Sequence, residues 1–208
     1  MTNISKLSII CNIMKTRTEA LSYIKSPIFS RREALEVGLN TYDLGELVKS
    51  GLLEREGRGL YRKTDSEISE HESYAKALAH LGEPSAISLW SALAFHDLTE
   101  EVPDKIWVYL PLEKYSHLKD LMVVRKTDPK WEVGIEVIEG IRVTNIERTI
   151  VEALADVRHF DKFTPVRILL SAIRNKRTTE TKLLAMARKL GLDDKVKDSL
   201  LIFQDFYV

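Results

Sequence analysis

Apolar residues recur with a helical spacing near the start of the chain. Leu21 and Ile24 lie three positions apart, and either Thr16 or Thr18 can cap the free backbone N–H groups of a helix start. Pro27 disfavours a helical conformation in the residue before it. The pattern therefore predicts a first helix that starts near residue 16 and ends before Pro27.

Two further helices follow, and each begins with a pair of residues that fits a capping box. In this motif the cap side chain accepts a backbone N–H three residues on, and the carboxylate at that position accepts the N–H of the cap. Ser30 and Glu33 fit the motif, as do Asn40 and Asp43, while Gly38 can end the shorter helix in a left-handed conformation. Two helices joined by a short turn with a glycine are typical of a helix-turn-helix.

The period then changes to that of β-strands. Residues 52–56 and 60–63 flank a glycine-rich tip at 57–59, which predicts a hairpin. The order of three helices followed by a hairpin is that of a winged helix. We predict this fold for residues 15–64 and leave residues 1–14 as an unassigned leader.

The remaining residues, 65–208, predict an α+β domain with a small sheet and C-terminal helices. A helix capped by Ser69 and Glu72 and a helix over 85–96 come first. Strands are expected at 106–110, 121–125, 134–138 and 141–144. Later helices are expected to start at Asn145, at Thr164 with Pro165, at Thr178 or Thr179 and at Asp193.

Charge is distributed unevenly along a chain whose formal net charge is zero. The 31 basic residues balance the 31 acidic ones, which excludes a uniformly basic nucleic-acid coat. Residues 1–63 hold 11 basic and 7 acidic side chains, residues 64–104 hold 1 and 9, and residues 105–208 hold 19 and 15. The segment 162–197 alone holds 10 basic and 3 acidic residues. An anion-facing surface at each end of the chain is one interpretation, and ordinary fluctuation of charge is the other.

The helix over about 41–50 has the length and width to enter the major groove of DNA. Cations before it and on the hairpin can bind phosphates, with free N–H groups of the preceding helix assisting. The candidate DNA-binding residues are Ser30, Arg31, Arg32, Asn40, Thr41, Tyr42, Lys49, Arg55, Arg58, Arg62 and Lys63. Asp43 and Glu46 on the same helix repel phosphates, so we expect the helix ends and the wing to supply most of the binding energy. A winged helix used for protein contacts or packing is the alternative.

No pattern for catalysis or metal binding stands out. Glycine-rich phosphate loops, nucleophile motifs and zinc-ligand spacings are lacking in the sequence, so we expect neither an enzyme nor a cofactor. Arg148 after a strand can either hold an anion or form an ion pair that fixes a helix to the sheet, and the second reading is favoured. A second basic surface is expected from Arg174, Lys176, Arg177, Arg188 and Lys189.

Two further features of the sequence bear on where in the cell the protein is expected to lie. Cys11 is the single cysteine, so no disulfide can form within the chain and a reducing cytoplasm is the default. The apolar run at 7–14 is far shorter than the roughly 20 residues of a membrane helix.

Three stretches resemble the AbiEi-type antitoxins of abortive-infection, type IV toxin–antitoxin systems. They are 49–62, 87–99 with the strand at 106–111, and 141–154. The resemblance implies a protein whose winged helix binds repeats in its own promoter and represses it. It also implies a second domain that counters a nucleotidyltransferase-like toxin without a stable complex between them. The acidic face of the 41–50 helix departs from the family, in which more cations are common.

Two other functions remain open. One is a winged-helix regulator whose second domain senses a ligand or protein, with no toxin involved. The other is a nuclease built on the α+β domain. A neighbouring nucleotidyltransferase-like gene would favour the antitoxin, and metal-dependent cleavage of DNA would favour the nuclease.

Overall fold

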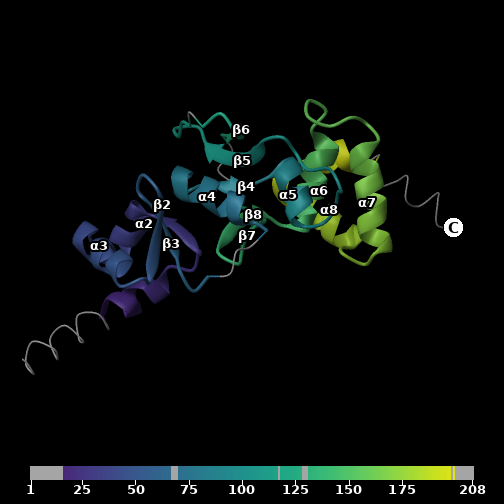
Figure 1. The fold of residues 1–208 in the computed structure, drawn as a ribbon. Coiled ribbons are helices and arrows are strands. Elements are labelled where there is room, and N and C mark those ends of the chain that lie inside the picture. Colours follow the sequence, from purple (N-terminus) through teal and green to yellow (C-terminus); the bar gives the residue numbers. More distant parts are fainter. Residues whose placement is uncertain (1–15, 67–69, 117, 128–130, 198, 200–208) are drawn as a thin grey trace, which may run out of the picture. The chain divides into compact units, whose positions relative to one another are not determined.

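The computed structural model describes residues 16–66, 70–116, 118–127, 131–197 and 199 (Figure 1). The chain divides into two compact units, the first ending at Glu83 and the second starting at Pro84. Among the described residues, no helix combines the length and the apolar character needed to cross a membrane.

The first unit is a winged helix. Residues 16–23 are helical, as predicted. The elements that follow are β1 (Ile28–Ser30), α2 (Arg31–Glu36), α3 (Thr41–Lys49), β2 (Leu53–Gly57), β3 (Leu60–Lys63) and α4 (Glu72–Leu81). The three strands form an antiparallel sheet in the order β1-β3-β2. The short strand β1 is not predicted by the sequence pattern, because its three residues acquire a strand partner only when the wing folds beside them.

The core of the first unit lies between its helices and the sheet. Phe29, Leu44 and Leu47 are fully buried, and Leu21 of the first helix and Leu53 of β2 pack in the same cluster. The leucines of α3 lie three positions apart and therefore share one face of the helix. The opposite face of α3 is left at the surface.

Helix α4 belongs to the first unit, whereas the sequence places the domain boundary at residues 64–65. It packs against β1 and β3, and its Glu72 and Lys76 form ion pairs with side chains of the wing. The expected cap Ser69 lies outside the described residues. His71 occupies the N-cap position of α4 without a capping hydrogen bond from its side chain.

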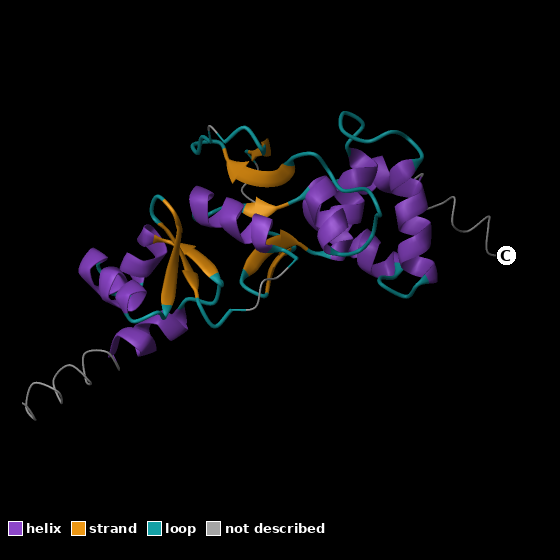
Figure 2. Cartoon of the chain, in the orientation of Figure 1, coloured by secondary structure: helices purple, strands orange, loops and turns teal. Residues whose placement is uncertain are grey.

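The second unit is built on a five-stranded mixed sheet in the order β6-β5-β4-β8-β7. Its strands are β4 (Ala86–Ile87), β5 (Ile106–Pro111), β6 (Leu121–Lys126), β7 (Ile135–Ile138) and β8 (Ile141–Thr144). Its helices are α5 (Leu89–Phe95), α6 (Ile146–Ala155), α7 (Thr164–Arg174) and α8 (Glu180–Leu190). Figure 2 shows the strands in orange and the helices in purple.

The predicted helix over 85–96 is wrong in its first residues. Ala86 and Ile87 instead form the central strand β4, in which Ile87 pairs with Val108 on one side and Val143 on the other. The run of small and apolar residues indicates burial equally well in a strand or in a helix, and the neighbouring strands decide between them. The other strands and the starts of α6, α7 and α8 agree with the sequence pattern.

Helix α5 packs on β5 and β8, α6 packs on α5, and α7 and α8 pack on α6. The shared core includes Leu93 of α5, Ile150 of α6, Leu169 of α7 and Leu183 of α8, all fully buried. The fold class is therefore α+β, with an N-terminal winged helix, as the sequence predicted.

Candidate nucleic-acid interface

Helix α3 starts at a complete capping box. The side-chain oxygen of Asn40 accepts the backbone N–H groups of Tyr42 (2.8 Å) and Asp43 (3.0 Å), and the Asp43 carboxylate accepts the N–H of Asn40 (3.1 Å). Thr41 and Tyr42 are exposed in the first turn, Tyr42 by 67%. A rigid helix start thus presents two polar side chains at the surface. The side-chain oxygen of Asn40, one of the candidate DNA-binding residues, is therefore occupied by the cap.

The acidic residues of α3 are paired with cations. Arg17, in the first helix, donates to the Asp43 carboxylate at 2.7 Å, and its guanidinium lies 5.4 Å from the Tyr42 ring centre. Lys49 forms an ion pair with Glu46 at 2.8 Å, and the hydrogen bond from Lys49 lowers the pKa of Glu46. The predicted repulsion of phosphates is therefore reduced by pairing, and Lys49 is in part occupied by Glu46. Arg17 is a site residue that sequence reasoning missed.

The wing exposes two arginines near its tip. A bulge interrupts the β2–β3 register between Arg55 and Gly57, and Gly59 adopts φ = +77° in the turn. Arg55 is exposed, with its guanidinium 5.9 Å from the ring centre of Tyr61. Arg58 is exposed and forms no hydrogen bond or ion pair with the described part of the chain. Both guanidiniums can therefore reach a phosphate without breaking an ion pair.

Arg62 and Lys63 are directed into the unit, which differs from their expected role as phosphate anchors. Arg62 forms ion pairs with Glu56 and, at 2.8 Å, with Glu72 of α4. Lys63 donates to the backbone carbonyl of Ile24 and is partly buried, and this burial lowers the pKa of Lys63. Both cations hold the elements of the winged helix together.

At the start of α2, where free backbone donors were expected, the N–H groups of Ser30, Arg31 and Glu33 are already bonded within the unit. The Ser30 hydroxyl and N–H both bond to Glu33 at 2.7 Å, and the N–H of Arg31 donates to the carbonyl of Gly59 at 2.8 Å. That last bond places Arg31 beside the wing tip. The Arg31 side chain is exposed and has no partner among the described residues.

Arg32 is also exposed, but it is held by other groups. Its guanidinium donates to the carbonyl of Glu83 at 3.0 Å and lies 3.4 Å from the Glu36 carboxylate. Among the predicted anchors, Arg31, Arg55 and Arg58 are exposed and form no ion pair with the described residues, and we call these three the wing-tip arginines.

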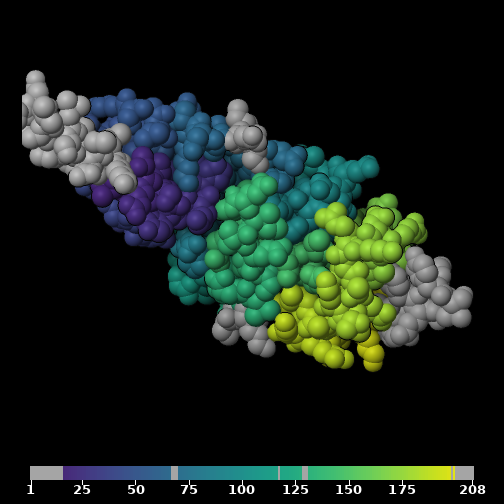
Figure 3. All heavy atoms as spheres, turned by 90° about the horizontal axis from the view of Figure 1, so that it is seen from below, coloured from purple at the N-terminus to yellow at the C-terminus, as the bar shows by residue number. Residues whose placement is uncertain are grey.

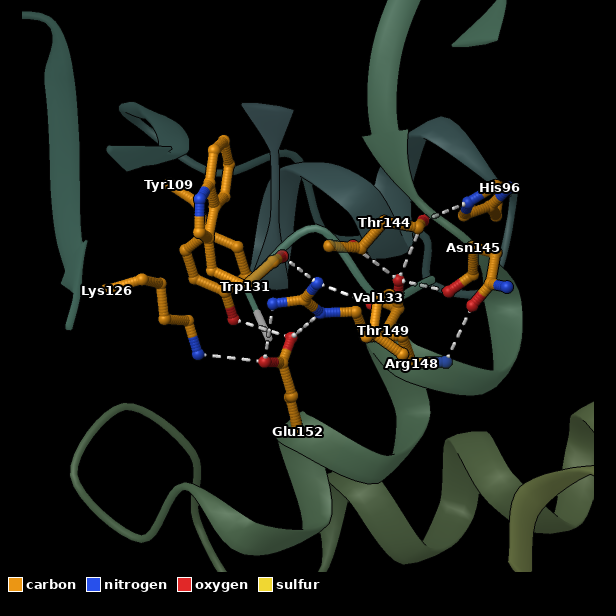
Figure 4. Close-up of polar contacts among 10 residues, drawn as sticks. All are labelled: His96, Tyr109, Lys126, Trp131, Val133, Thr144, Asn145, Arg148, Thr149 and Glu152. Atoms are coloured by element: carbon orange, nitrogen blue, oxygen red, sulfur yellow. Dashed lines mark hydrogen bonds and ion pairs between the residues drawn. The ribbon is translucent and has the colours of Figure 1, made fainter. Parts of the chain in front are cut away.

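The second unit holds a buried network centred on Arg148, whose side chain is 1% exposed (Figure 4). Its guanidinium bonds to both oxygens of Glu152, at 3.1 and 3.2 Å, and to the backbone carbonyls of Trp131 and Val133. Tyr109 of β5 donates its hydroxyl to the same carboxylate at 2.7 Å. Lys126 of β6 adds an ammonium at 2.8 Å. The network fixes α6 to the sheet, which confirms the favoured sequence reading of Arg148.

The turn before α6 is equally constrained. Asn145 accepts the N–H of Arg148 at 2.9 Å, and the hydroxyl of Thr149 lies 2.8 Å from that of Thr144. A Cβ on Gly134, which has φ = +75°, would lie 3.1 Å from the Cβ of Arg148. The loop with Trp131 and Val133 can approach Arg148 this closely because Gly134 has no side chain.

The tail cations do not form one cluster. Arg174 is the last residue of α7 and Lys176 and Arg177 follow it, whereas Arg188 and Lys189 lie in the last turn of α8. A helix of eleven residues is about 16 Å long, so α8 separates the two groups. The guanidinium of Arg177 donates to the carbonyl of His96 at 2.8 Å. The tail helices, yellow-green and yellow in Figure 3, form part of the surface of the second unit.

His96 makes the second unit sensitive to acid. Its Nε2 lies 2.7 Å from the carbonyl oxygen of Thr144. Burial lowers the pKa of His96, and Arg177 acts in the same direction, while the hydrogen bond to Thr144 and the charges of Glu136 and Asp97 oppose this shift. Because the folded pKa lies below the unfolded value, the unfolded chain takes up the proton first as the pH falls. The contribution of His96 to the free energy of unfolding is therefore complete above pH 7. It declines below about pH 6.5, by at most about 1.4 kcal/mol per pH unit.

We expect His96→Gln to remove this pH dependence of the free energy of unfolding, because glutamine does not titrate. Its side-chain amide can still donate to the Thr144 carbonyl, so the fold should be kept. Urea unfolding between pH 5 and 8 measures it, with exposed His80→Gln as the control. Equal pH slopes in wild type and His96→Gln would contradict the assignment.

Within the described residues, no group of three or more His, Cys, Asp or Glu side chains is arranged to hold a metal ion.

Residues 21–62 match the model of a protein family described as "Transcriptional regulator, AbiEi antitoxin". The match runs from the first helix to the wing and confirms the expected resemblance over that stretch. Among solved structures, the RV2827C protein from Mycobacterium tuberculosis aligns over 85% of this chain and 74% of its own, with 15% identity and a TM-score of 0.45. Comparison with curated proteins gave no match.

Proposed function

Starting from the match of residues 21–62 to AbiEi-type regulators, we propose that this protein is a DNA-binding transcriptional repressor and antitoxin. The observation that carries the DNA-binding half of this proposal is the exposure of the wing-tip arginines, together with the exposed face of α3 in the same unit. Guanidinium groups that form no ion pair with the described residues bind phosphates at little cost, because no ion pair has to be broken.

In the proposed complex α3 lies in the major groove of double-stranded promoter DNA. Thr41 and Tyr42 face base edges, and the wing-tip arginines contact phosphates on either side. The pairing of Asp43 with Arg17 allows the start of α3 to approach the duplex. We propose that the operator consists of repeats in the protein's own promoter, so that binding represses its own transcription.

The proposed antitoxin activity lies in the second unit and is not enzymatic. It counters a nucleotidyltransferase-like toxin of a type IV, abortive-infection system without forming a stable complex, and it requires no cofactor. The support is the resemblance of residues 87–99 and 141–154 to the family. In the structure, the first stretch covers the end of β4 and helix α5, and the second covers β8 and most of α6. The protein would act in the cytoplasm, where its DNA lies.

Co-expression with a neighbouring nucleotidyltransferase-like gene tests the two activities separately. We expect the wild-type protein to rescue growth and repress its promoter. A full-length variant with all three wing-tip arginines changed to alanine should lose repression and retain rescue, because the second unit is unaltered. Failure of both proteins to rescue would contradict the antitoxin assignment while leaving DNA binding intact.

The single substitution Arg58→Ala tests the wing. It should weaken binding to all DNA sequences to a similar extent and reduce the slope of log affinity against log salt by about 0.9, as expected for one lost phosphate contact. Fluorescence anisotropy at several salt concentrations measures both. Lys119→Ala, an exposed cation of the second unit, is the control for the change in net charge. An unaltered slope for Arg58→Ala would contradict the wing assignment.

A further inference from the structure

The second unit has an aromatic hollow that the proposed function does not use. Its volume is about 430 Å³, and Trp90, Trp107 and Met122 line it together with the segment 101–105. Trp90 comes from α5, Trp107 from β5 and Met122 from β6, while 101–105 is the connection that leads into β5. Regular elements therefore carry both tryptophans, and a loop forms the rim.

The two tryptophans are held in place by a shared neighbour. Trp90 stacks on Phe160 with ring centres 4.6 Å apart, and its Nε1–H donates to the carbonyl of His159 at 3.1 Å. The His159 ring meets Trp107 edge-on at 4.9 Å, and the backbone N–H of Trp107 donates to the Ser91 hydroxyl at 2.9 Å. The hollow is thus formed before any ligand arrives, which reduces the entropy cost of binding.

The rim carries carboxylates without partners. Glu101 and Asp104 are exposed and form no ion pair with the described part of the chain. Lys105 is the one cation among the lining residues. Val102, between the two carboxylates, is 86% exposed, so apolar surface on the rim is also uncovered.

We propose that this hollow binds an arginine side chain from a basic segment of another protein. Two independent features favour the same chemical group. Tryptophan rings attract cations, and the planar guanidinium can stack on them and still donate hydrogen bonds. The carboxylates of Glu101 and Asp104 can accept those bonds at the rim. Val102 and Pro103 provide apolar contact for the residues next to the arginine.

Titration of the ¹⁵N-labelled full chain with a short blocked peptide, containing two adjacent arginines between alanines, tests the proposal. The indole N–H signals of Trp90 and Trp107 should shift with saturation, and the signal of Trp131, which does not line the hollow, should not. A peptide with lysines in place of the arginines should bind more weakly, and one with glutamates should not bind. Equal shifts of all three indole signals, or equal affinities for the three peptides, would overturn the proposal.

Removing acidic or basic charges from the rim should change the affinity for the arginine peptide in opposite directions. Glu101→Gln with Asp104→Asn should weaken arginine-peptide binding about tenfold, and Lys105→Gln should strengthen it about threefold. These residues are exposed, so the fold should persist, which the unchanged spectrum of the remaining residues would verify. Glu113→Gln is the control for loss of an exposed carboxylate elsewhere. An affinity that follows net charge alone, with Glu113→Gln weakening binding as much as the single substitution Glu101→Gln made without Asp104→Asn, would also overturn the proposal.

Discussion

Replacing Arg148 with alanine should lower the free energy of unfolding of the second unit by about 3–5 kcal/mol. The substitution leaves the Glu152 carboxylate, itself 6% exposed, with only the Tyr109 hydroxyl and the Lys126 ammonium as donors. It also leaves the carbonyls of Trp131 and Val133 without their guanidinium donor. Buried acceptors that lose a charged donor lose far more than an exposed ion pair contributes.

Urea unfolding followed by tryptophan fluorescence measures the loss. Arg158→Ala removes an exposed arginine three residues beyond the end of α6 and should change the free energy by less than about 0.5 kcal/mol. Exchanging Arg148 and Glu152 together for methionine and leucine should cost less than Arg148→Ala, because the buried carboxylate is removed with its guanidinium and the remaining Lys126 ammonium is 24% exposed. A loss for Arg148→Ala no larger than that for Arg158→Ala would contradict the structural role of the network.

Changing all three wing-tip arginines to alanine should reduce DNA affinity by about 100-fold at 0.1 M salt. Each phosphate contact contributes about 0.9 to the slope of log affinity against log salt, so three contacts should reduce it by about 2.7. None of the three side chains forms an ion pair with the described residues, so the stability of the winged helix should change little. The loss should be similar for operator and random DNA, because phosphate contacts carry no sequence information.

The matched control removes the same charge from the second unit. Lys119, Arg158 and Lys162 are exposed and lack ion pairs within the described chain. Their combined change to alanine lowers the net charge by the same three units. If this control weakened DNA binding as much as the wing-tip variant, binding would depend on overall charge, and the interface would be assigned wrongly.

Local features of the winged helix could be predicted from the sequence. The capping boxes at Ser30 and Asn40 depend on residues three positions apart, so spacing alone locates α2 and α3. The wing can be predicted because a glycine-rich tip lies between two short segments whose residue pattern is that of β-strands. The same holds for Asn145 as the cap of α6.

The pairing of charges over long distances in the sequence could not be predicted. Arg17 and Asp43 are 26 positions apart, and nothing near Asp43 signals its partner. The sequence predicted Arg62 as a phosphate anchor on the wing, but in the structure Arg62 pairs with Glu72 of α4. A count of cations on a hairpin therefore overestimates the phosphate contacts, because it cannot distinguish cations facing solvent from cations that hold the fold together.

The affinity of the full chain for the DNA upstream of its own gene is the most direct test of the central claim. It should be measured by anisotropy against a shuffled duplex of equal length and composition, between 0.05 and 0.2 M salt. The upstream DNA should bind at least about 1,000-fold more tightly, and both affinities should fall steeply as the salt concentration rises. Equal affinity for the two duplexes, or binding that does not depend on salt, would contradict it.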